Sequence, residues 1–177
     1  MTEVIHYIGR NEMKKLIQLL GLFGLILPKA LFGQSGQTFE LALKAIYKNS
    51  VPIVHHNETE KLVNAHFLDT RSEEEFEVSS IPGATFVGYD DFKMSSVSQI
   101  PKTDTIVVYC SIGYRSERIG EKLQKAGYKN VLNLYGGIFD WKNNDKTVVD
   151  SEKRPTEKVH AYNRTWGIFL EKGEKVY

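Results

Sequence analysis

The strongest constraint on the fold is an apolar run that ends at the only cysteine and leads at once into a turn and a helix. Residues 105–109, TIVVY, are rich in β-branched side chains, which is typical of a strand buried on both faces. Residues 116–127 are amphipathic at helical spacing and end at Gly127, a residue suited to a helix C-terminus. A further strand is predicted over residues 130–137. This order of strand, helix and strand predicts a parallel sheet.

The remainder of the chain alternates between strand and helix signals in the same manner. Residues that can cap a helix precede three helical segments: Thr38, Asn57 and Ser72. The helix after Ser72 opens with glutamates 73–75, which suit a helix N-terminus and are expected to be solvated. Further strands are predicted over residues 51–56, 66–71 and 81–88. The whole pattern predicts an α/β fold with a central, mostly parallel sheet flanked by helices.

A chain of 177 residues can bury one substantial core, so one folded domain is expected. The net charge is only +1, which gives no electrostatic reason to expect nucleic acid or an anionic membrane as a partner. The single cysteine excludes an intrachain disulfide and a metal site built from cysteines. The sequence also lacks the nucleotide-binding motifs GxGxxG and GxxxxGK(S/T).

The N-terminal segment has the pattern of a secretory signal peptide. Met13 is followed by two lysines, an apolar run over residues 16–27, and then small and polar residues. We expect residues 1–33 to be a signal peptide, with Met13 as an alternative initiator, and the mature protein to be exported, either periplasmic or secreted. The apolar run is short for a bilayer span, and a membrane anchor or a buried N-terminal helix are the alternatives.

The expected mature chain divides into two parts. Residues 34–150 carry the alternating strand and helix signals and form the predicted domain. Residues 151–177 are too aromatic and apolar for a disordered tail, so they are expected to pack on that domain as a C-terminal extension. Within them, IFLEKGEKVY is predicted to form a hairpin around Lys172 and Gly173.

Cys110 lies at the carboxyl end of a predicted strand, which is where open α/β sheets bind their ligands. The turn of residues 110–115, CSIGYR, leads into a helix expected to start near Ser116, and such a turn directs backbone N–H groups toward one point. These donors and the helix dipole would stabilise a thiolate and make Cys110 a nucleophile near neutral pH. Gly113 lets the turn curl, and Arg115 supplies positive charge for an anionic substrate. A lone cysteine can instead be a small buried apolar residue.

Three ordered motifs resemble those of the rhodanese family. YCSIGYRS resembles the family's active-site loop, in which a cysteine opens a six-residue loop and carries a persulfide. FLDTRSEEEFEVSSIPGA resembles the upstream motif, with an Asp-x-Arg after a strand, an acidic helix and an Ile-Pro-Gly-Ala turn. GYKNVLNLYGGIFDW resembles the downstream motif, with paired glycines and a following tryptophan. The similarity runs from about Leu62 to Lys142 and implies a central five-stranded parallel sheet flanked by helices.

The resemblance implies a role for each residue at a matching position. Cys110 would be the nucleophile that accepts sulfur, and Ser116 would cap the following helix. Asp69 and Arg71 would lie beside the loop and brace it through hydrogen bonds, unless they only hold the end of their strand. The substrate-binding cradle, formed mainly by backbone amides, would consist of Ser111, Ile112, Gly113, Tyr114 and Arg115.

The activity implied by the resemblance is transfer of a sulfane sulfur from a small donor such as thiosulfate to a thiol or cyanide acceptor. The sulfur would travel as a persulfide on Cys110, and the reaction would need no metal and no organic cofactor. Contact with a membrane is expected only through an uncleaved N-terminal segment.

Two other functions are compatible with the same motifs. A rhodanese module can act as a sulfur carrier or a protein-interaction domain without catalytic turnover. A cysteine-dependent phosphatase or arsenate reductase is the second alternative, but such enzymes place their arginine six residues after the cysteine, which makes a wider cradle. Here Arg115 follows Cys110 by five residues, and the narrower cradle favours a single sulfur atom.

Overall fold

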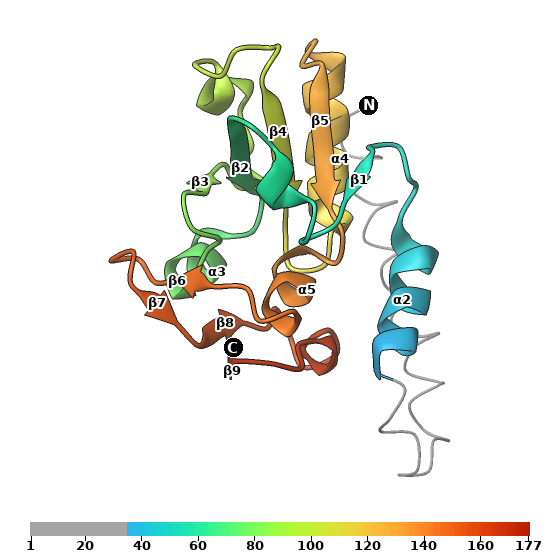
Figure 1. Cartoon of the computed structure of the whole chain (residues 1–177), viewed down its shortest axis with the longest axis vertical. Helices are drawn as coiled ribbons and strands as arrows, with labels where there is room; N and C mark the ends of the chain where they lie inside the picture. Colours follow the sequence, from blue (N-terminus) through green and yellow to red (C-terminus); the bar gives the residue numbers. More distant parts are fainter. Residues whose placement is uncertain (1–34) are drawn as a thin grey trace. The chain divides into compact units, whose positions relative to one another are not determined.

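The central sheet of the protein consists of five parallel strands. The computed structural model describes residues 35–177, and within them these strands lie in the order β1-β5-β4-β2-β3 (Figure 1). Their bounds are Ile53–Val54 for β1, Ala65–Asp69 for β2, Thr85–Phe86 for β3, Thr105–Tyr109 for β4 and Asn130–Leu134 for β5. The predicted five-stranded parallel α/β sheet is therefore confirmed.

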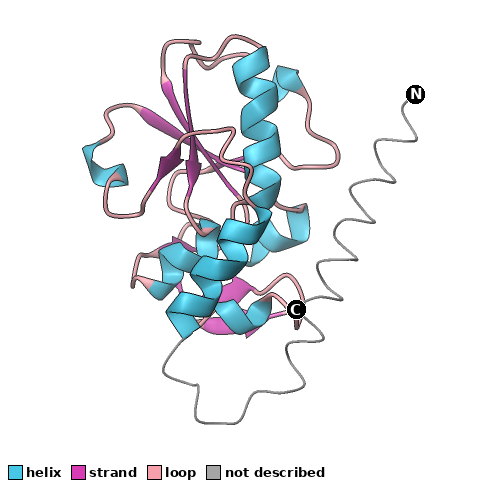
Figure 2. Ribbon diagram, turned by 90° about the vertical axis from the view of Figure 1, so that its right-hand side faces the viewer, coloured by secondary structure: helices cyan, strands magenta, loops and turns pink. Residues whose placement is uncertain are grey.

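Helices flank this sheet, as Figure 2 shows. They are α2 (Ser35–Ile46), α3 (Glu73–Val78), α4 (Tyr114–Lys125) and α5 (Gly137–Asn143). The amphipathic α4 packs along β4 and β5. Strand β4 is buried on both faces, since Ile106, Val107 and Val108 are all fully inaccessible. That environment explains why its sequence is continuously apolar rather than alternating.

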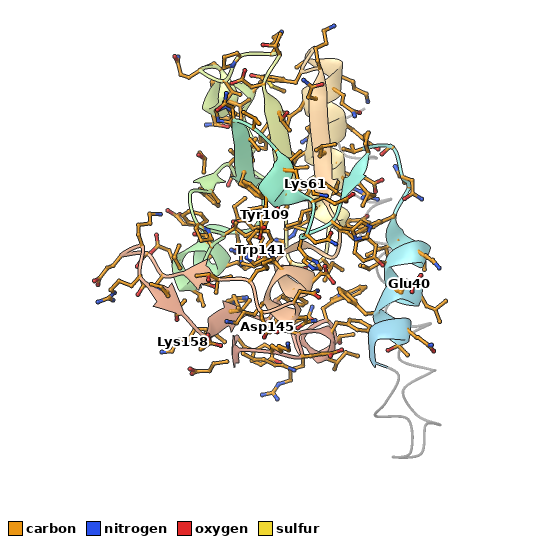
Figure 3. The ribbon with its side chains drawn as sticks, in the orientation of Figure 1. Glu40, Lys61, Tyr109, Trp141, Asp145 and Lys158 are labelled. Carbon is orange, nitrogen blue, oxygen red and sulfur yellow. The ribbon has the colours of Figure 1, made fainter. Side chains whose placement is uncertain are left out.

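The register of β2 and β4 brings two of the sequence motifs together at the carboxyl edge of the sheet. Asp69 pairs with Tyr109, so Thr70 and Cys110 leave their strands side by side. The Thr70 N–H and hydroxyl both donate to the Tyr109 carbonyl, at 2.9 and 3.0 Å. Figure 3 labels Tyr109 at this edge, on the side where α5 and the C-terminal strands lie.

Two of the predicted helix ends are confirmed. Ser72 caps α3 in a reciprocal arrangement, because its hydroxyl accepts from the Glu75 N–H while the Glu75 carboxylate accepts from the Ser72 N–H. Gly127 follows the last turn of α4 at φ +93°, a conformation that suits glycine.

Two of the predicted caps are wrong. Helix α2 begins at Ser35, which places Thr38 inside the helix. The helix extends one turn ahead of Phe39, the first of its buried apolar residues. Asn57 precedes only a short 3₁₀ helix, Thr59–Lys61, whose cap position is Glu58. A propensity to cap does not specify where hydrogen bonding begins when tertiary packing positions the helix.

The C-terminal segment does not form the predicted hairpin. Strand β6 (Val148–Val149) pairs antiparallel with β7 (Pro155–Thr156), and β8 (Lys158–His160) pairs parallel with β9 (Glu174–Val176). Residues expected in the first hairpin strand instead form a 3₁₀ helix, Gly167–Phe169. This turn buries Phe169 against Trp166 and Phe39. Tertiary burial of aromatic rings thus overrides the local hairpin signal.

Residues 39–177 form one compact unit. The predicted signal peptide, residues 1–33, lies outside the described residues. Within residues 35–177, none of the helices combines the length and the apolar character needed to cross a membrane.

Candidate active site

Cys110 opens a tight loop between β4 and α4 and is almost completely buried, with 1% of its surface exposed. The Gly113 N–H donates to the Cys110 Sγ at 3.1 Å, which closes the loop around the sulfur. Gly113 adopts φ +93° and is the residue immediately before α4. The loop therefore requires glycine at this position, as the sequence predicted.

The helix begins earlier than the sequence suggested. Helix α4 starts at Tyr114, so Ser116 lies inside it and does not cap it. The Ser116 hydroxyl instead donates to Asn133 Oδ1 at 2.7 Å, which joins α4 to β5. Arg115 lies in the first turn of the helix. The left-handed backbone at Gly113 turns the chain sharply, so the helix can begin at the next residue, Tyr114, two positions before Ser116.

Each of the first four carbonyl groups of the loop, from Cys110 to Gly113, accepts a hydrogen bond from a residue outside the loop. Ile138 and Phe139 of α5 donate their N–H groups to the carbonyls of Cys110 and Ser111, at 2.9 and 3.2 Å. The other two carbonyls, of Ile112 and Gly113, accept from side chains. Because the N–H and C=O of a peptide point in opposite directions, the bond from Tyr47 to the Ile112 carbonyl leaves the Gly113 N–H of the same peptide on the other side, where it meets the Cys110 Sγ.

Tyr47 and Asn133 supply those side-chain bonds. The Tyr47 hydroxyl donates to the Ile112 carbonyl at 2.7 Å and accepts from the Gly136 N–H at 3.0 Å. Burial raises the pKa of Tyr47 well above its ordinary value, so the hydroxyl keeps its proton at neutral pH. Asn133 Nδ2 donates to the Gly113 carbonyl at 3.0 Å. Sequence inspection missed both residues, since neither lies within the loop.

The paired glycines of the downstream motif allow α5 to approach the loop. Gly137 adopts φ +56°, and a Cβ placed there would collide with the Cys110 carbonyl oxygen. The close approach lets the next two residues of α5 donate to the loop carbonyls. The motif therefore has a steric cause that is visible only in the folded chain.

Arg115 is held by Glu75 of α3. Its Nη1 and Nη2 donate to the two carboxylate oxygens, each at 2.7 Å, and Nη2 also donates to the Ser111 hydroxyl at 3.0 Å. Ser111 in turn donates to Glu75 at 2.7 Å. Burial alone would raise the pKa of Glu75, but Arg115, Ser111 and Arg71 hold it down at about 2. Arg115 is thus a neutralised, fixed group rather than a free charge.

The expectation that glutamates 73–75 are all solvated is wrong for Glu75, which is buried. Its spacing from Ser72 pointed to a capping box, but that signal concerns only the helix backbone. The ion pair with Arg115 spans 40 residues of sequence and could not be read from local spacing.

Asp69 and Arg71 form a fully buried ion pair beneath this network. Arg71 Nη2 donates to Asp69 Oδ2 at 2.7 Å, and the same nitrogen donates to the Ser79 carbonyl. The guanidinium lies 5.8 Å from the centre of the Tyr109 ring. Their hydrogen bonds hold the end of β2 and the turn after α3, and they reach the cysteine loop through Tyr109 rather than directly.

The rim of the loop is aromatic. Arg118 lies on the Tyr114 ring, 3.4 Å from its centre, and donates to the Tyr114 carbonyl. The Tyr162 ring covers Arg115 at 5.0 Å. Tyr162 belongs to the C-terminal segment, and sequence inspection did not connect it with the site.

Within residues 35–177, His, Cys, Asp and Glu side chains form no group of three or more suited to a metal ion. The arrangement around Cys110 is suited instead to stabilising an anionic sulfur by backbone dipoles.

A rhodanese-like domain model matches residues 54–144, which is half of the chain. The chain belongs to the rhodanese-like family. Within the described chain, this assignment agrees with the parallel sheet and with the loop that opens at Cys110.

Curated relatives of this rhodanese-like chain include sulfur-handling proteins. A Bacillus subtilis protein, YrkF, named as a candidate sulfur carrier, is 32% identical over 76 residues, covering 43% of this chain and 40% of that protein. A sulfurtransferase of Allochromatium vinosum is 41% identical over 56 residues, covering 32% of this chain and 52% of that protein. The chain therefore spans about half, or less, of the length of these relatives.

A solved thiosulfate sulfurtransferase from Pseudomonas aeruginosa has the same fold. Its TM-score is 0.54 at 23% identity, over 68% of this chain and 23% of that chain. The rhodanese-like fold expected from the sequence is confirmed.

Proposed function

We propose that this rhodanese-like protein transfers a sulfane sulfur from a small donor such as thiosulfate to a thiophilic acceptor, cyanide or a thiol, through a persulfide on Cys110. The observation that carries the proposal is the 3.1 Å hydrogen bond from the Gly113 N–H to Sγ, within a loop whose first four carbonyls accept hydrogen bonds from residues outside it. Backbone N–H groups stabilise an anionic sulfur without a metal or a cofactor.

In the first half-reaction, the Cys110 thiolate attacks the outer sulfur of thiosulfate. A new S–S bond forms to Sγ, the S–S bond of thiosulfate breaks, and sulfite leaves with the bonding electron pair. The inner face of the loop then stabilises the negative charge on the terminal sulfur of the persulfide.

In the second half-reaction, a nucleophilic acceptor attacks that terminal sulfur. With cyanide, a C–S bond forms, thiocyanate leaves, and the S–S electron pair returns to Sγ as the thiolate. The two half-reactions share the Cys110 sulfur, so substituted-enzyme kinetics are expected.

The Glu75–Arg115 pair favours sulfur transfer over phosphate chemistry. A phosphatase needs its loop arginine to bind the substrate oxyanion, whereas both terminal nitrogens of Arg115 already donate to the Glu75 carboxylate. We propose that Arg115 shapes the loop and that backbone amides hold the transferred sulfur.

A sulfur carrier without rapid turnover is the second candidate, favoured by the burial of Cys110 and by the relative named as a candidate carrier. Incubation with thiosulfate, followed by mass measurement of the intact protein, tests the first half-reaction through a gain of one sulfur atom. Continuous thiocyanate release with cyanide supports the enzyme, and persulfide formation without turnover supports the carrier. No sulfur uptake would refute both.

We also propose export, because the segment from Met13 has the charged start and the short apolar run of a signal peptide. Expression with an intact N-terminus, fractionation and N-terminal sequencing test this. A cleaved protein outside the cytoplasm is expected. Uncleaved protein in the cytoplasm or in the membrane would contradict it.

A further inference from the structure

The C-terminal segment contributes a side chain to the active site. Tyr162 lies beyond the family match, which ends at residue 144. Its ring centre is 5.0 Å from the Arg115 guanidinium carbon. The segment that carries it includes β8 and β9, which lie with α3 and α5 on the carboxyl side of the central sheet (Figure 1).

Tyr162 adopts a backbone conformation that is unusual for a bulky residue. Its φ is +62°, a left-handed value that L side chains rarely take. Hydrogen bonds hold the chain before and after this residue: the Tyr162 N–H donates to His160 Nδ1 at 3.1 Å, and the Asn163 N–H donates to the Ala161 carbonyl at 2.7 Å, which closes a tight turn around Tyr162. Strain of this kind persists only where the surrounding structure imposes it, and it is concentrated at functional sites.

Tyr162 covers the face of Arg115 that its polar partners leave free. Glu75 and Ser111 bind the edge of the guanidinium, and the Tyr162 ring covers it at a cation–π distance. Arg115 lies within electrostatic reach of Cys110 as well as Tyr162. The Cys110 sulfur is itself almost inaccessible, and Arg115 belongs to the loop that encloses it and is bound to the Ser111 hydroxyl next to Cys110.

We propose that Tyr162 is a specificity-determining residue, which forms with Arg115 one wall of the entrance to Cys110 and restricts sulfur acceptors to small nucleophiles such as cyanide and low-molecular-weight thiols. The role in acceptor choice rests on the proposed sulfur transfer. In this proposal the acceptor approaches the terminal sulfur on the side of the loop that Tyr162 borders, and protein thiols are excluded by size.

Alkylation tests the wall without any sulfur chemistry. Cys110 is the only cysteine, so maleimide labelling of the full chain reports on this site alone. N-methylmaleimide and N-pyrenylmaleimide share one reactive group and differ in size. Tyr162→Gly, which also relieves the backbone strain, should raise the ratio of the pyrenyl to the methyl rate by roughly tenfold, a discrimination that a modest change in pocket shape supports.

Matched variants distinguish the loss of the Tyr162 ring at the entrance from a general loosening of the fold. Tyr162→Phe keeps the ring and should keep the wild-type ratio. Tyr177→Gly removes the ring that lies on Arg164 in the same segment and should also leave the ratio unchanged. Tyr162→Asn, which tolerates a left-handed backbone, replaces the glycine variant if that one fails to fold. An unchanged ratio in folded Tyr162→Gly, or in Tyr162→Asn where it replaces that variant, would overturn the proposal, as would an equal rise in Tyr177→Gly.

Acceptor kinetics then test the consequence for sulfur transfer. In persulfide-loaded Tyr162→Gly, kcat/KM for reduced thioredoxin should rise relative to kcat/KM for cyanide. Tyr162→Phe keeps the ring and should show the wild-type ratio of the two values. An unchanged preference overturns the specificity role. Failure of all acceptors in every variant would refute the proposed sulfur transfer, while the alkylation ratio would still report on the wall.

Discussion

Arg115 and Glu75 meet through two hydrogen bonds of 2.7 Å that join the start of α4 to α3. The same carboxylate accepts from the Ser111 hydroxyl and from the Ser72 N–H, so one side chain holds the loop, the helix cap and the arginine together. The upstream and loop motifs of the sequence are therefore one structural unit.

Glu75→Gln should destabilise the protein and impair sulfur transfer. The substitution leaves the partly buried Arg115 charge, whose side chain is 16% exposed, without its counter-ion, which costs about 3 kcal/mol in free energy of unfolding. Chemical denaturation measures the loss. Glu73→Gln in the same helix turn removes an exposed carboxylate and serves as the control. Equal stability of the two variants would contradict the assigned role of Glu75.

The Glu75 carboxylate also predicts a pH dependence of stability. Its pKa is lowered in the folded chain from 4.5 to about 2, so the ionised form stabilises the fold above pH 4.5. This contribution is lost as the pH falls from 4.5 toward 2. Thermal unfolding at several pH values should show a decline for the wild type that Glu75→Gln lacks over this range. Parallel curves would show that Glu75 is not the responsible group.

Tyr47→Phe should destabilise the Cys110 loop, although Tyr47 lies outside it in the sequence. The lost hydroxyl leaves the Ile112 carbonyl and the Gly136 N–H without their partner, at a cost of about 1–3 kcal/mol. The rate of persulfide formation should fall with the stability. Tyr135→Phe is a suitable control, because Tyr135 packs edge-on against Tyr47 and its hydroxyl makes no hydrogen bond within the described chain. The idea fails if both variants behave alike.

Gly137→Ala should displace the Cys110 loop. The new Cβ would collide with the Cys110 carbonyl oxygen, and the overpacking should cost about 3 kcal/mol or more and abolish transfer. Gly83→Ala has a similar positive φ but open space around its Cβ, so backbone strain alone should cost about 1 kcal/mol. Comparing their unfolding curves and activities separates collision from strain, and similar losses would argue against the collision.

Cys110→Ser should remove sulfur transfer and preserve the fold. The serine hydroxyl is smaller than the thiol and cannot carry a persulfide. Apart from the Gly113 N–H bond to the side chain of residue 110, the loop is held by four hydrogen bonds to the carbonyls of residues 110–113, and these do not depend on that side chain. Thiocyanate release and circular dichroism measure the two outcomes. Substantial residual thiosulfate:cyanide activity would exclude Cys110 as the nucleophile.

The sequence alone determined the features that depend on neighbouring residues. Apolar runs such as residues 105–109 predicted buried parallel strands, Ser72 predicted a helix start and Gly127 a helix end, because period and capping are local properties of the chain. The position of Cys110 at a strand end and the motifs around it also predicted the family and the loop.

Only the tertiary structure decided which side chains complete the site. Glu75, Tyr47 and Tyr162 reach the loop from 35, 63 and 52 residues away from Cys110 along the chain, and their partners follow from how α2, α3 and the C-terminal segment pack around one sheet edge. The start of α4 at Tyr114 likewise follows from the left-handed backbone at Gly113. Such contacts depend on distance in space, which local sequence patterns do not encode.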